Sequence, residues 1–412
     1  MEEKEIGQTL SVKIRENVLS KLDMTRDLED EEVKHVIEHE IWLAAKKHYI
    51  SLEERNSIKR GIFNSLRRLD ILQELLEDRE ITEIMVNGAK DIFVEKHGKL
   101  FRWDASFSAK ERLEDVIQQI VSGCNRMVNE TNPIVDARLE DGSRVNIVLA
   151  PVALNGPILT IRKFSKEPYT METLVGLGSL SEETAYILKK LVQSKYNIFI
   201  SGGTGSGKTT FLNALSSCIP EDERIITIED SAELRLSNIQ NLVSLEARNA
   251  NIEGKNEITI RELIKTALRM RPDRIILGEV RDGAAVDLIS AFDTGHDGSL
   301  STGHGNSSKD MLGRLETLFL MGLELPLLAV RKQIASAIDI MVHLGRLRDK
   351  SRRVLEISEV IETETGPDIS VLYKFREVGE KQGVILGELF RTENRLKNRG
   401  KLERAGLVLN EI

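Results

Sequence analysis

Hydrophobic residues change their spacing along the chain, and each change predicts a different kind of element. Within the first 69 residues they recur at helical intervals among charged residues, as in Val33, Ile37 and Ile41. This spacing is typical of amphipathic helices, and two or three helices are expected here. Ser51 and Glu54 match a capping box, which predicts that one helix begins at this point.

Short apolar runs separated by turn residues begin near residue 72. Ile84–Val86 precedes Asn87-Gly88, and Ile92–Val94 precedes His97-Gly98. Such runs are typical of strands joined by tight turns, and they predict a small α/β domain.

The same domain is expected to continue with a helix near 109–122, a hairpin around 141–142 and a strand over 158–164. Residues 166–180 contain Pro168 and two glycines with little periodicity, and they are predicted to be a linker.

Beyond residue 180, near-continuous apolar runs alternate with helical patterns. This alternation predicts a parallel sheet with helices on both faces. The expected order is a helix over 181–194, a strand over 197–201, a glycine loop and a helix, a strand over 224–228, a helix over 259–270 and a strand over 274–277.

Composition narrows the class of protein. The chain has 412 residues, 41% of them hydrophobic and 30% charged, which fits a globular protein of two or three domains. The formal net charge of -8 gives no support for nucleic acid or an anionic membrane as the main partner. Cys124 and Cys218 lie far apart, so neither a disulfide framework nor a cysteine zinc site is expected. No apolar run approaches the roughly 20 residues of a membrane span and the start is unlike a signal peptide, so a cytosolic protein is expected.

One stretch after the strand at 197–201 carries a phosphate-binding pattern. Residues 202–209 read Gly-Gly-Thr-Gly-Ser-Gly-Lys-Thr, which satisfies G-x-x-x-x-G-K-[ST] between an apolar strand and a helix. Backbone N–H groups and the helix N-terminus favour phosphate, and Lys208 reaches the β- and γ-phosphates. The Thr209 hydroxyl is the expected Mg²⁺ ligand, so the pattern predicts binding of ATP with Mg²⁺. The predicted binding residues are Gly203, Thr204, Gly205, Ser206, Gly207, Lys208, Thr209 and Thr210.

Acidic residues follow two of the predicted strands. Glu229 and Asp230 come directly after one apolar run, and Glu279 follows the run at 275–278. The carboxyl ends of parallel strands lie at one edge of a sheet, which is also the edge of the glycine loop. A carboxylate there can hold Mg²⁺ or polarise the attacking water, so hydrolysis is predicted in addition to binding.

These residues resemble a known family. Residues 227–230, 271–281 and 294–304 look like the Asp box, the Walker B motif and the His box of the secretion ATPases, the superfamily that powers type II secretion, type IV secretion and type IV pili. The resemblance runs from about residue 72 to about residue 365. The branch that this chain resembles is the CpaF-type ATPases of tight-adherence (Tad) pili, which share the stretch at 135–139, the turn at 141–144 and a helical extension.

The resemblance implies a fold and a set of roles. The implied fold is α/β: a RecA-like P-loop nucleotide-binding domain over 181–412, a small α/β domain over 70–165 and a helical N-terminal extension over 1–69. Glu229 and Glu279 are implied to act on water and metal, and His304 to sense or position the γ-phosphate. Three arginines of the small domain are implied to reach the phosphates and to connect domain closure with nucleotide state: Arg138, Arg144 and Arg162.

The resemblance also implies partners. A homohexamer is expected in the cytoplasm, at the inner face of the cytoplasmic membrane, where it drives inner-membrane platform proteins of a pilus or secretion system. Type II and pilus-extension members carry a four-cysteine zinc insertion that two distant cysteines cannot supply, which favours the Tad or type IV secretion side. Two alternatives stay open: a P-loop nucleic-acid translocase or helicase, which the acidic net charge disfavours, and a nucleotide-controlled regulator.

Three further patterns have simpler interpretations. His35 and His39 match H-x-x-E-H, but they lie in a charged helix that predicts a solvated face. The basic stretch 395–404 is interpreted as a C-terminal face or a partner surface rather than a nucleic-acid site. His296 lies in the His box, where it either approaches the phosphates or belongs to a turn.

Overall fold

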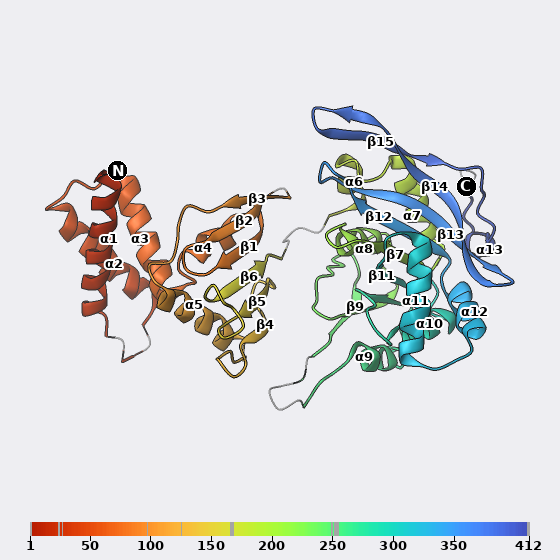
Figure 1. Cartoon of the computed structure of the whole chain (residues 1–412), viewed down its shortest axis with the longest axis horizontal. Coiled ribbons are helices and arrows are strands. Elements are labelled where there is room, and N and C mark those ends of the chain that lie inside the picture. The colour runs from red at the N-terminus through yellow and green to blue at the C-terminus, as the bar shows by residue number, and fades with distance from the viewer. Residues whose placement is uncertain are drawn as a thin grey trace. The chain divides into compact units, whose positions relative to one another are not determined.

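The computed structural model describes residues 2–23, 25–26, 28–96, 98–124, 126–164, 169–248, 250 and 255–409. The chain divides into two compact units, Met1–Ser165 and Lys166–Ile412 (Figure 1), called here the N-terminal unit and the C-terminal unit. Among the residues so described, no helix combines the length and the apolar content needed to cross a bilayer.

A bundle of helices begins the N-terminal unit, as the helical spacing predicts. The helices are α1 (Glu2–Lys21), α2 (Asp30–Ala45) and α3 (Leu52–Arg67). They lie side by side (Figure 1) around a small core that includes Val18, Ile37 and Ile62. The capping box is confirmed: Ser51 Oγ accepts the N–H of Glu54 at 3.2 Å, and the Glu54 carboxylate accepts the N–H of Ser51 at 2.7 Å. These bonds satisfy donors that the start of α3 leaves without partners.

A six-stranded antiparallel sheet completes this unit, in the order β3-β2-β1-β6-β5-β4. Its strands are β1 (Ile81–Asn87), β2 (Ile92–Lys96), β3 (Lys99–Arg102), β4 (Ile134–Arg138), β5 (Arg144–Val148) and β6 (Ile158–Arg162). Two helices share its core, α4 (Leu72–Glu77) and α5 (Lys110–Gly123). The predicted helix is α5, the predicted hairpin is β4–β5, and the predicted last strand is β6. Of the turn predicted at 97–98, His97 lies outside the described residues.

A nine-stranded sheet forms the centre of the C-terminal unit, in the order β15-β14-β13-β12-β7-β11-β10-β8-β9. The strands from β12 to β9 in this order are parallel, as the alternation of strands and helices predicts. β13, β14 and β15 pair antiparallel, because tight turns rather than helices join them. The strands are β7 (Ile198–Gly202), β8 (Arg224–Glu229), β9 (Asn241–Glu246), β10 (Arg274–Leu277), β11 (Leu300–His304), β12 (Ile340–Arg346), β13 (Arg352–Thr363), β14 (Gly366–Lys381) and β15 (Val384–Arg391).

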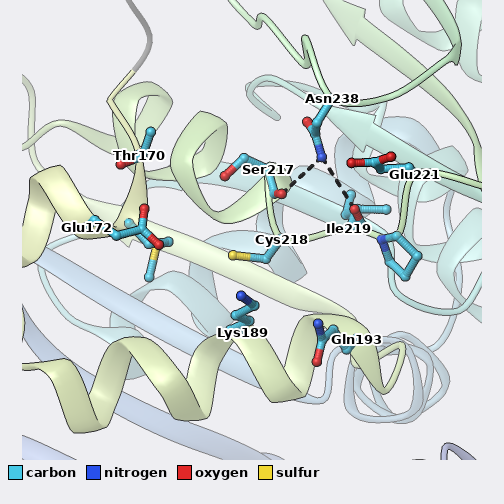
Figure 2. Close-up of a pocket in the computed structure, with 11 residues that line it drawn as sticks. Thr170, Glu172, Lys189, Gln193, Ser217, Cys218, Ile219, Glu221 and Asn238 are labelled. Atoms are coloured by element: carbon cyan, nitrogen blue, oxygen red, sulfur yellow. Dashed lines mark hydrogen bonds between the residues drawn. The ribbon is translucent and has the colours of Figure 1, made fainter.

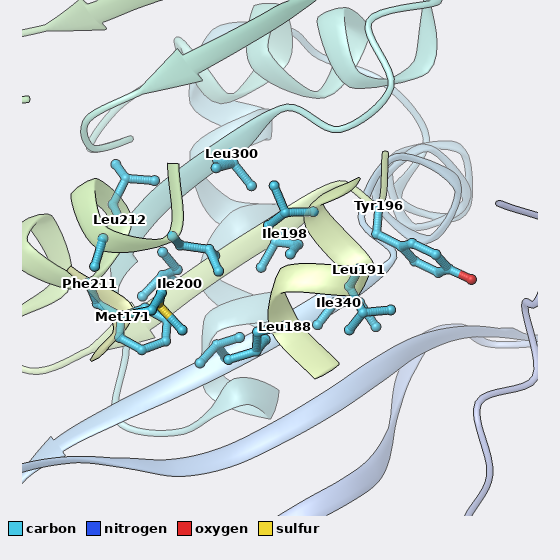
Figure 3. Packing of buried hydrophobic residues seen from close by; sticks show 14 of the residues in the cluster. Met171, Leu188, Leu191, Tyr196, Ile198, Ile200, Phe211, Leu212, Leu300 and Ile340 are labelled. Carbon is cyan, nitrogen blue, oxygen red and sulfur yellow. The ribbon is translucent and has the colours of Figure 1, made fainter. Parts of the chain in front are cut away.

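Helices cover both faces of the parallel strands. One core contains α6 (Met171–Gly176), α7 (Glu182–Gln193) and α8 (Lys208–Ser216), and the other contains α9 (Ile260–Ala267), α10 (Ala285–Asp293), α11 (Ser308–Gly322) and α12 (Leu327–Ala337). Ile198 and Ile200 of β7 pack into the first core (Figure 3), and Phe199 between them packs into the second. Each such side chain contributes about 1.5–3 kcal/mol by its burial. β7 is therefore held firmly from both sides, and with it the start of the glycine loop.

The predicted linker is partly packed, and the basic stretch near residue 400 contains a short helix that was not predicted. Within the predicted linker, α6 forms and buries Met171 in the core with α7 and α8 (Figure 3), while Pro168 lies outside the described residues. The basic stretch 395–404 contains α13 (Gly400–Arg404) and folds back onto its own unit. There Leu402 is 4% exposed, and Lys401 Nζ lies 2.7 Å from an Asp339 carboxylate oxygen. The expected basic face is present, because Arg395, Lys397, Arg399 and Arg404 are exposed, while Lys401 takes part in an internal ion pair.

Candidate nucleotide site

The glycine loop lies between the carboxyl end of β7 and the first turn of α8. Gly207 precedes α8 with a φ of 91°, in the left-handed region that glycine adopts without strain. Gly202 has no room for a side chain, because a Cβ there would lie 2.6 Å from the carbonyl oxygen of Leu344. These constraints hold the loop against the N-terminus of α8, whose N–H groups and dipole favour an anionic ligand.

Lys208 is buried and contacts the loop from within. Its Nζ donates to the carbonyl oxygens of Gly202 and Gly203, both at 3.2 Å, and lies 3.3 Å from Nδ1 of His304. An ammonium group only donates, so Nδ1 is the acceptor and the ring proton of neutral His304 belongs on Nε2. Burial and the charge of Lys208 lower the pKa of His304, which favours this neutral form.

Glu279 lies on the other side of the His304 ring. One carboxylate oxygen is 3.1 Å from Nε2 of His304, and the other accepts a hydrogen bond from Arg281 at 3.1 Å. Arg281 also lies 3.2 Å from Asp230. Burial by itself raises the pKa of Glu279, but the hydrogen bond from Arg281 and the charges of Arg281, His304 and Lys208 outweigh it and lower that pKa. The carboxyl group is therefore ionised at neutral pH.

The register of the sheet explains why these residues meet. His304 of β11 is opposite Gly202 of β7, and Glu279 follows the end of the neighbouring strand β10. The carboxyl ends of parallel strands share one edge of the sheet. The structure thus brings Lys208, His304 and Glu279 together, and their roles in hydrolysis stay predictions.

Glu229, the second predicted acid, lies at the end of β8 and is 4% exposed. Its Oε1 accepts the backbone N–H of Glu233 at 2.9 Å and that of Leu234 at 3.1 Å. These bonds give the carboxylate an anchoring role for the segment after β8. Its action on water or metal stays a prediction.

The residues present fit Mg²⁺. Thr209, the predicted ligand, is the second residue of α8 and is half-buried. Mg²⁺ takes oxygen ligands and binds through one or two carboxylates together with phosphate oxygens and water. The Thr209 hydroxyl and the ionised Glu279 carboxylate, both next to the glycine loop, supply donors of this kind.

The three predicted arginines of the N-terminal unit lie in one row across neighbouring strands. Arg138 of β4 is opposite Arg144 of β5, and Arg144 is opposite Arg162 of β6. Opposite residues of antiparallel strands share a face, with Cβ atoms about 5 Å apart. Arg162 also lies 4.0 Å from Glu83. The fold therefore places three cations side by side, and their contact with phosphates stays a prediction.

The other histidines singled out in the sequence lie elsewhere. His35 and His39 are exposed on α2, and Glu38 between them pairs with Lys59, as expected for a solvated face. The described part of the chain contains no group of three or more His, Cys, Asp or Glu residues placed to hold a metal ion. His296 precedes β11, at the sheet edge opposite the glycine loop, and its Nδ1 lies 3.3 Å from a backbone carbonyl oxygen. The turn interpretation of His296 is the one that the structure supports.

A separate pocket of about 390 Å³ opens at the far end of α8 (Figure 2). Its lining includes Glu172, Lys189, Cys218 and Asn238, and burial raises the pKa of the Cys218 thiol. α8 begins at the glycine loop and ends at Ser216, so the length of the helix separates this pocket from the phosphate-binding loop. None of the predicted nucleotide-site residues lines it among those described, and it is not the nucleotide site.

Arg281 is a residue of the site to which the sequence assigned no role. It joins the acidic groups that follow β8 and β10 by contacting both Asp230 and Glu279. Arg281 has the opposite charge and lies two residues after Glu279 in the sequence, and this spacing alone could have predicted their contact. Its contact with Asp230 depends on the adjacency of the two strands, which the sequence does not state.

A glycine loop and helix N-terminus on a parallel sheet, with a lysine, a histidine and a glutamate at one strand edge, define a P-loop nucleotide-binding protein of the RecA-like class. The sequence model of the family described as "Type II/IV secretion system protein" matches residues 66–382. The chain belongs to this family, as the resemblance of its motifs predicts.

Named relatives come from transfer and secretion systems. A putative conjugal transfer protein of Mycobacterium tuberculosis is 34% identical over 300 residues, which cover 71% of this chain and 85% of the relative. The type IV secretion system protein VirB11 of Bartonella henselae is 30% identical over 325 residues, which cover 69% of this chain and 90% of the relative.

Solved structures agree on the fold. The pilus retraction motor PilT with bound ADP has a TM-score of 0.52 at 18% identity, over 83% of this chain and 88% of that chain. The ATPase DotB of Legionella pneumophila has a TM-score of 0.50 at 21% identity, over 71% of this chain and 80% of that chain. These likenesses confirm the predicted RecA-like α/β fold.

Proposed function

We propose that the protein is a cytosolic ATPase that assembles as a homohexamer and powers a membrane-embedded machine. That machine is a Tad or other type IV pilus, or a type II or type IV secretion system, at the inner face of the cytoplasmic membrane. The observation that carries the proposal is the cluster of Lys208, His304 and Glu279 beside the glycine loop. Membership of the secretion family supports the biological setting.

The cluster has the parts that phosphoryl transfer to water requires. Lys208 and the loop N–H groups hold the β- and γ-phosphates, with Nζ exchanging its contacts to Gly202 and Gly203 for phosphate oxygens. Thr209 and Glu279 would hold Mg²⁺, which would supply neutralisation of the phosphate charge. The ionised carboxylate of Glu279 orients and polarises the attacking water. Neutral His304 lies between Lys208 and Glu279 and positions these two groups for the γ-phosphate and the attacking water.

The arginine row of the N-terminal unit is a candidate phosphate contact. Three adjacent cations repel one another, and an anion that contacts all of them relieves this repulsion. Arg138, Arg144 and Arg162 form such a row, and a triphosphate is an anion of suitable charge. We therefore propose that they engage the phosphates of bound ATP. Hydrolysis then releases them and moves the N-terminal unit against the C-terminal unit, which is the motion that drives the platform proteins.

The proposal is tested with Glu279→Gln. This change keeps the shape of the side chain but removes the charge that polarises water, so ATP hydrolysis should fall by about 100-fold or more. ATP binding and nucleotide-dependent assembly into hexamers should remain. Phosphate release, equilibrium binding of labelled ATP and analytical ultracentrifugation provide the three measurements.

Glu364→Gln is the matched control, because Glu364 is exposed in the turn between β13 and β14. It should hydrolyse ATP at the wild-type rate. Full turnover by a monomeric Glu279→Gln protein would refute the proposal. Stimulation of hydrolysis by single-stranded DNA, falling steeply with salt, would instead favour the nucleic-acid translocase.

A further inference from the structure

The turn between β12 and β13 lies against the glycine loop. Arg352, the first residue of β13, donates from Nε to the carbonyl oxygen of Gly205 at 2.9 Å. A Cβ on Gly207 would lie 3.3 Å from Cδ of the same arginine. Arg346, the last residue of β12, places its Nη1 3.8 Å from the position of a Cβ on Gly205. Two cations thus flank the loop from the same turn, within the C-terminal unit alone.

The bond to Gly205 orients a peptide group of the loop. In a trans peptide the carbonyl oxygen and the following N–H point in opposite directions. Arg352 holds the Gly205 oxygen on its own side, and the N–H of Ser206 points to the carbonyl oxygen of Gly203 at 3.3 Å, across the loop. This bond closes a turn within the loop, and loops of successive N–H groups bind phosphate oxygens. Arg352 therefore fixes the orientation of the peptide group between Gly205 and Ser206 within the loop.

Hydrogen bonds and ion pairs connect the same turn to the β14–β15 hairpin. Arg348 donates to Glu377 at 2.7 Å and to Glu380 at 2.8 Å and 3.1 Å. The neighbouring Asp349 accepts the backbone N–H of Ile385 at 2.8 Å. One exposed ion pair contributes little, but a guanidinium shared by two carboxylates has a defined geometry. The position of the turn thus depends on the order of the hairpin.

We propose that Arg352 is a positioning residue of the phosphate loop, and that the turn 346–352 couples nucleotide binding to the β14–β15 hairpin. This inference rests on the proposed nucleotide function and assigns a regulation of the same site. The coupling reaches β15 (Val384–Arg391), which lies beyond residue 382, where the match to the family ends. Nucleotide binding fixes the loop, the loop fixes the turn through Arg352, and the turn orders the hairpin through Arg348.

Nucleotide affinity tests the role of Arg352. In the Glu279→Gln background, which isolates binding from hydrolysis, Arg352→Gln should weaken binding of a fluorescent ATP analogue by about 10-fold, the size of one charge-assisted hydrogen bond. Arg352→Lys keeps a cationic donor and should recover most of that affinity. With Glu279 intact, Arg352→Gln should raise KM by a similar factor and leave kcat at saturating ATP nearly unchanged. Arg391→Gln, on an exposed arginine of β15, is the matched control and should bind as the parent does.

Hydrogen exchange tests the coupling. Binding of the ATP analogue should slow the hydrogen exchange of backbone amides in residues 377–388 of the Glu279→Gln protein. Adding Arg348→Gln to the same background should abolish this slowing. Unchanged affinity in Arg352→Gln, or protection that does not depend on Arg348, would overturn the inference. If the Glu279→Gln protein itself binds no nucleotide, the proposed function fails. If it binds normally and Arg352→Gln binds equally well, only this inference fails.

Discussion

The buried ion pair between Arg274 and Glu223 gives a quantitative prediction about the C-terminal unit. Arg274, at the start of β10, is fully buried and donates to the Glu223 carboxylate at 2.7 Å and 2.8 Å. Its Nη1 also donates to the carbonyl oxygens of Val192 at 2.7 Å and Gly298 at 3.2 Å. Arg274→Met removes the cation and leaves the carboxylate and both carbonyl groups without it. We expect the variant to be strongly destabilised.

The size of the destabilisation depends on the contacts that Glu223 keeps in the Arg274→Met variant. Removing one partner of a buried ion pair costs about 3–5 kcal/mol. Lys195 Nζ lies 3.7 Å from Glu223 and is 44% exposed, so it compensates part of the loss. The lower end of the range, about 3 kcal/mol, is therefore expected. For a unit of the size of Lys166–Ile412, each kcal/mol lowers Tm by roughly 2–4 °C, which gives a decrease of about 6–12 °C.

Differential scanning calorimetry measures this decrease. Trp42 and Trp103, the only two tryptophans, belong to the N-terminal unit, so their emission follows the unit that the mutation does not touch. The double variant Arg274→Met/Glu223→Leu removes the unpaired charge and should recover much of the lost stability. A single variant that melts within 2 °C of wild type would have lost only about 1 kcal/mol of stability or less. That result would refute the reasoning. So would a double variant that is no more stable than the single one.

Other predictions follow from the same contacts. Gly202→Ala should weaken ATP binding by about 10-fold or more, because the loop must move to relieve the clash with a carbonyl oxygen 2.6 Å from the new Cβ. Leu402→Ala should lower the unfolding free energy of the C-terminal unit by about 2–5 kcal/mol, since the side chain is 4% exposed. The pKa of His304 is lowered, so the acid limb of the ATPase profile should lie below the ordinary histidine value of about 6.5, and His304→Gln should remove it.

Each of these has a control or an opposing outcome. Gly313→Ala, in a helix where a Cβ meets nothing within 4 Å, should bind ATP as wild type does. Val408→Ala, at a side chain 73% exposed, should change the unfolding free energy by less than about 0.5 kcal/mol.

The folded state favours neutral His304. The stability that this group contributes is therefore complete above the pKa of His304 in the unfolded chain, and it is lost as pH falls through the pKa of His304 in the folded protein. An acid limb unchanged in His304→Gln would assign it to another group.

Local patterns were sufficient for much of the fold. The capping box at Ser51, the hairpin around 141–142 and the alternation of strands and helices through 277 each depend on residues close in sequence. The parallel sheet with helices on both faces followed from this alternation, while the order of its strands was not predicted. The antiparallel strands after β12 and the helix α6 were not predicted, because their positions depend on packing against elements already formed.

The sequence by itself determined the chemistry of the phosphate loop: glycines, Lys208 and Thr209 are contiguous, and their spacing alone predicts a phosphate-binding turn at a helix start. Only the tertiary structure decided what surrounds that loop. The row of arginines in the N-terminal unit depends on strand register, and the contact of Arg352 with Gly205 joins residues 147 positions apart. Such contacts are set by the order and pairing of strands, which burial of the whole core selects, and no local stretch of sequence records them.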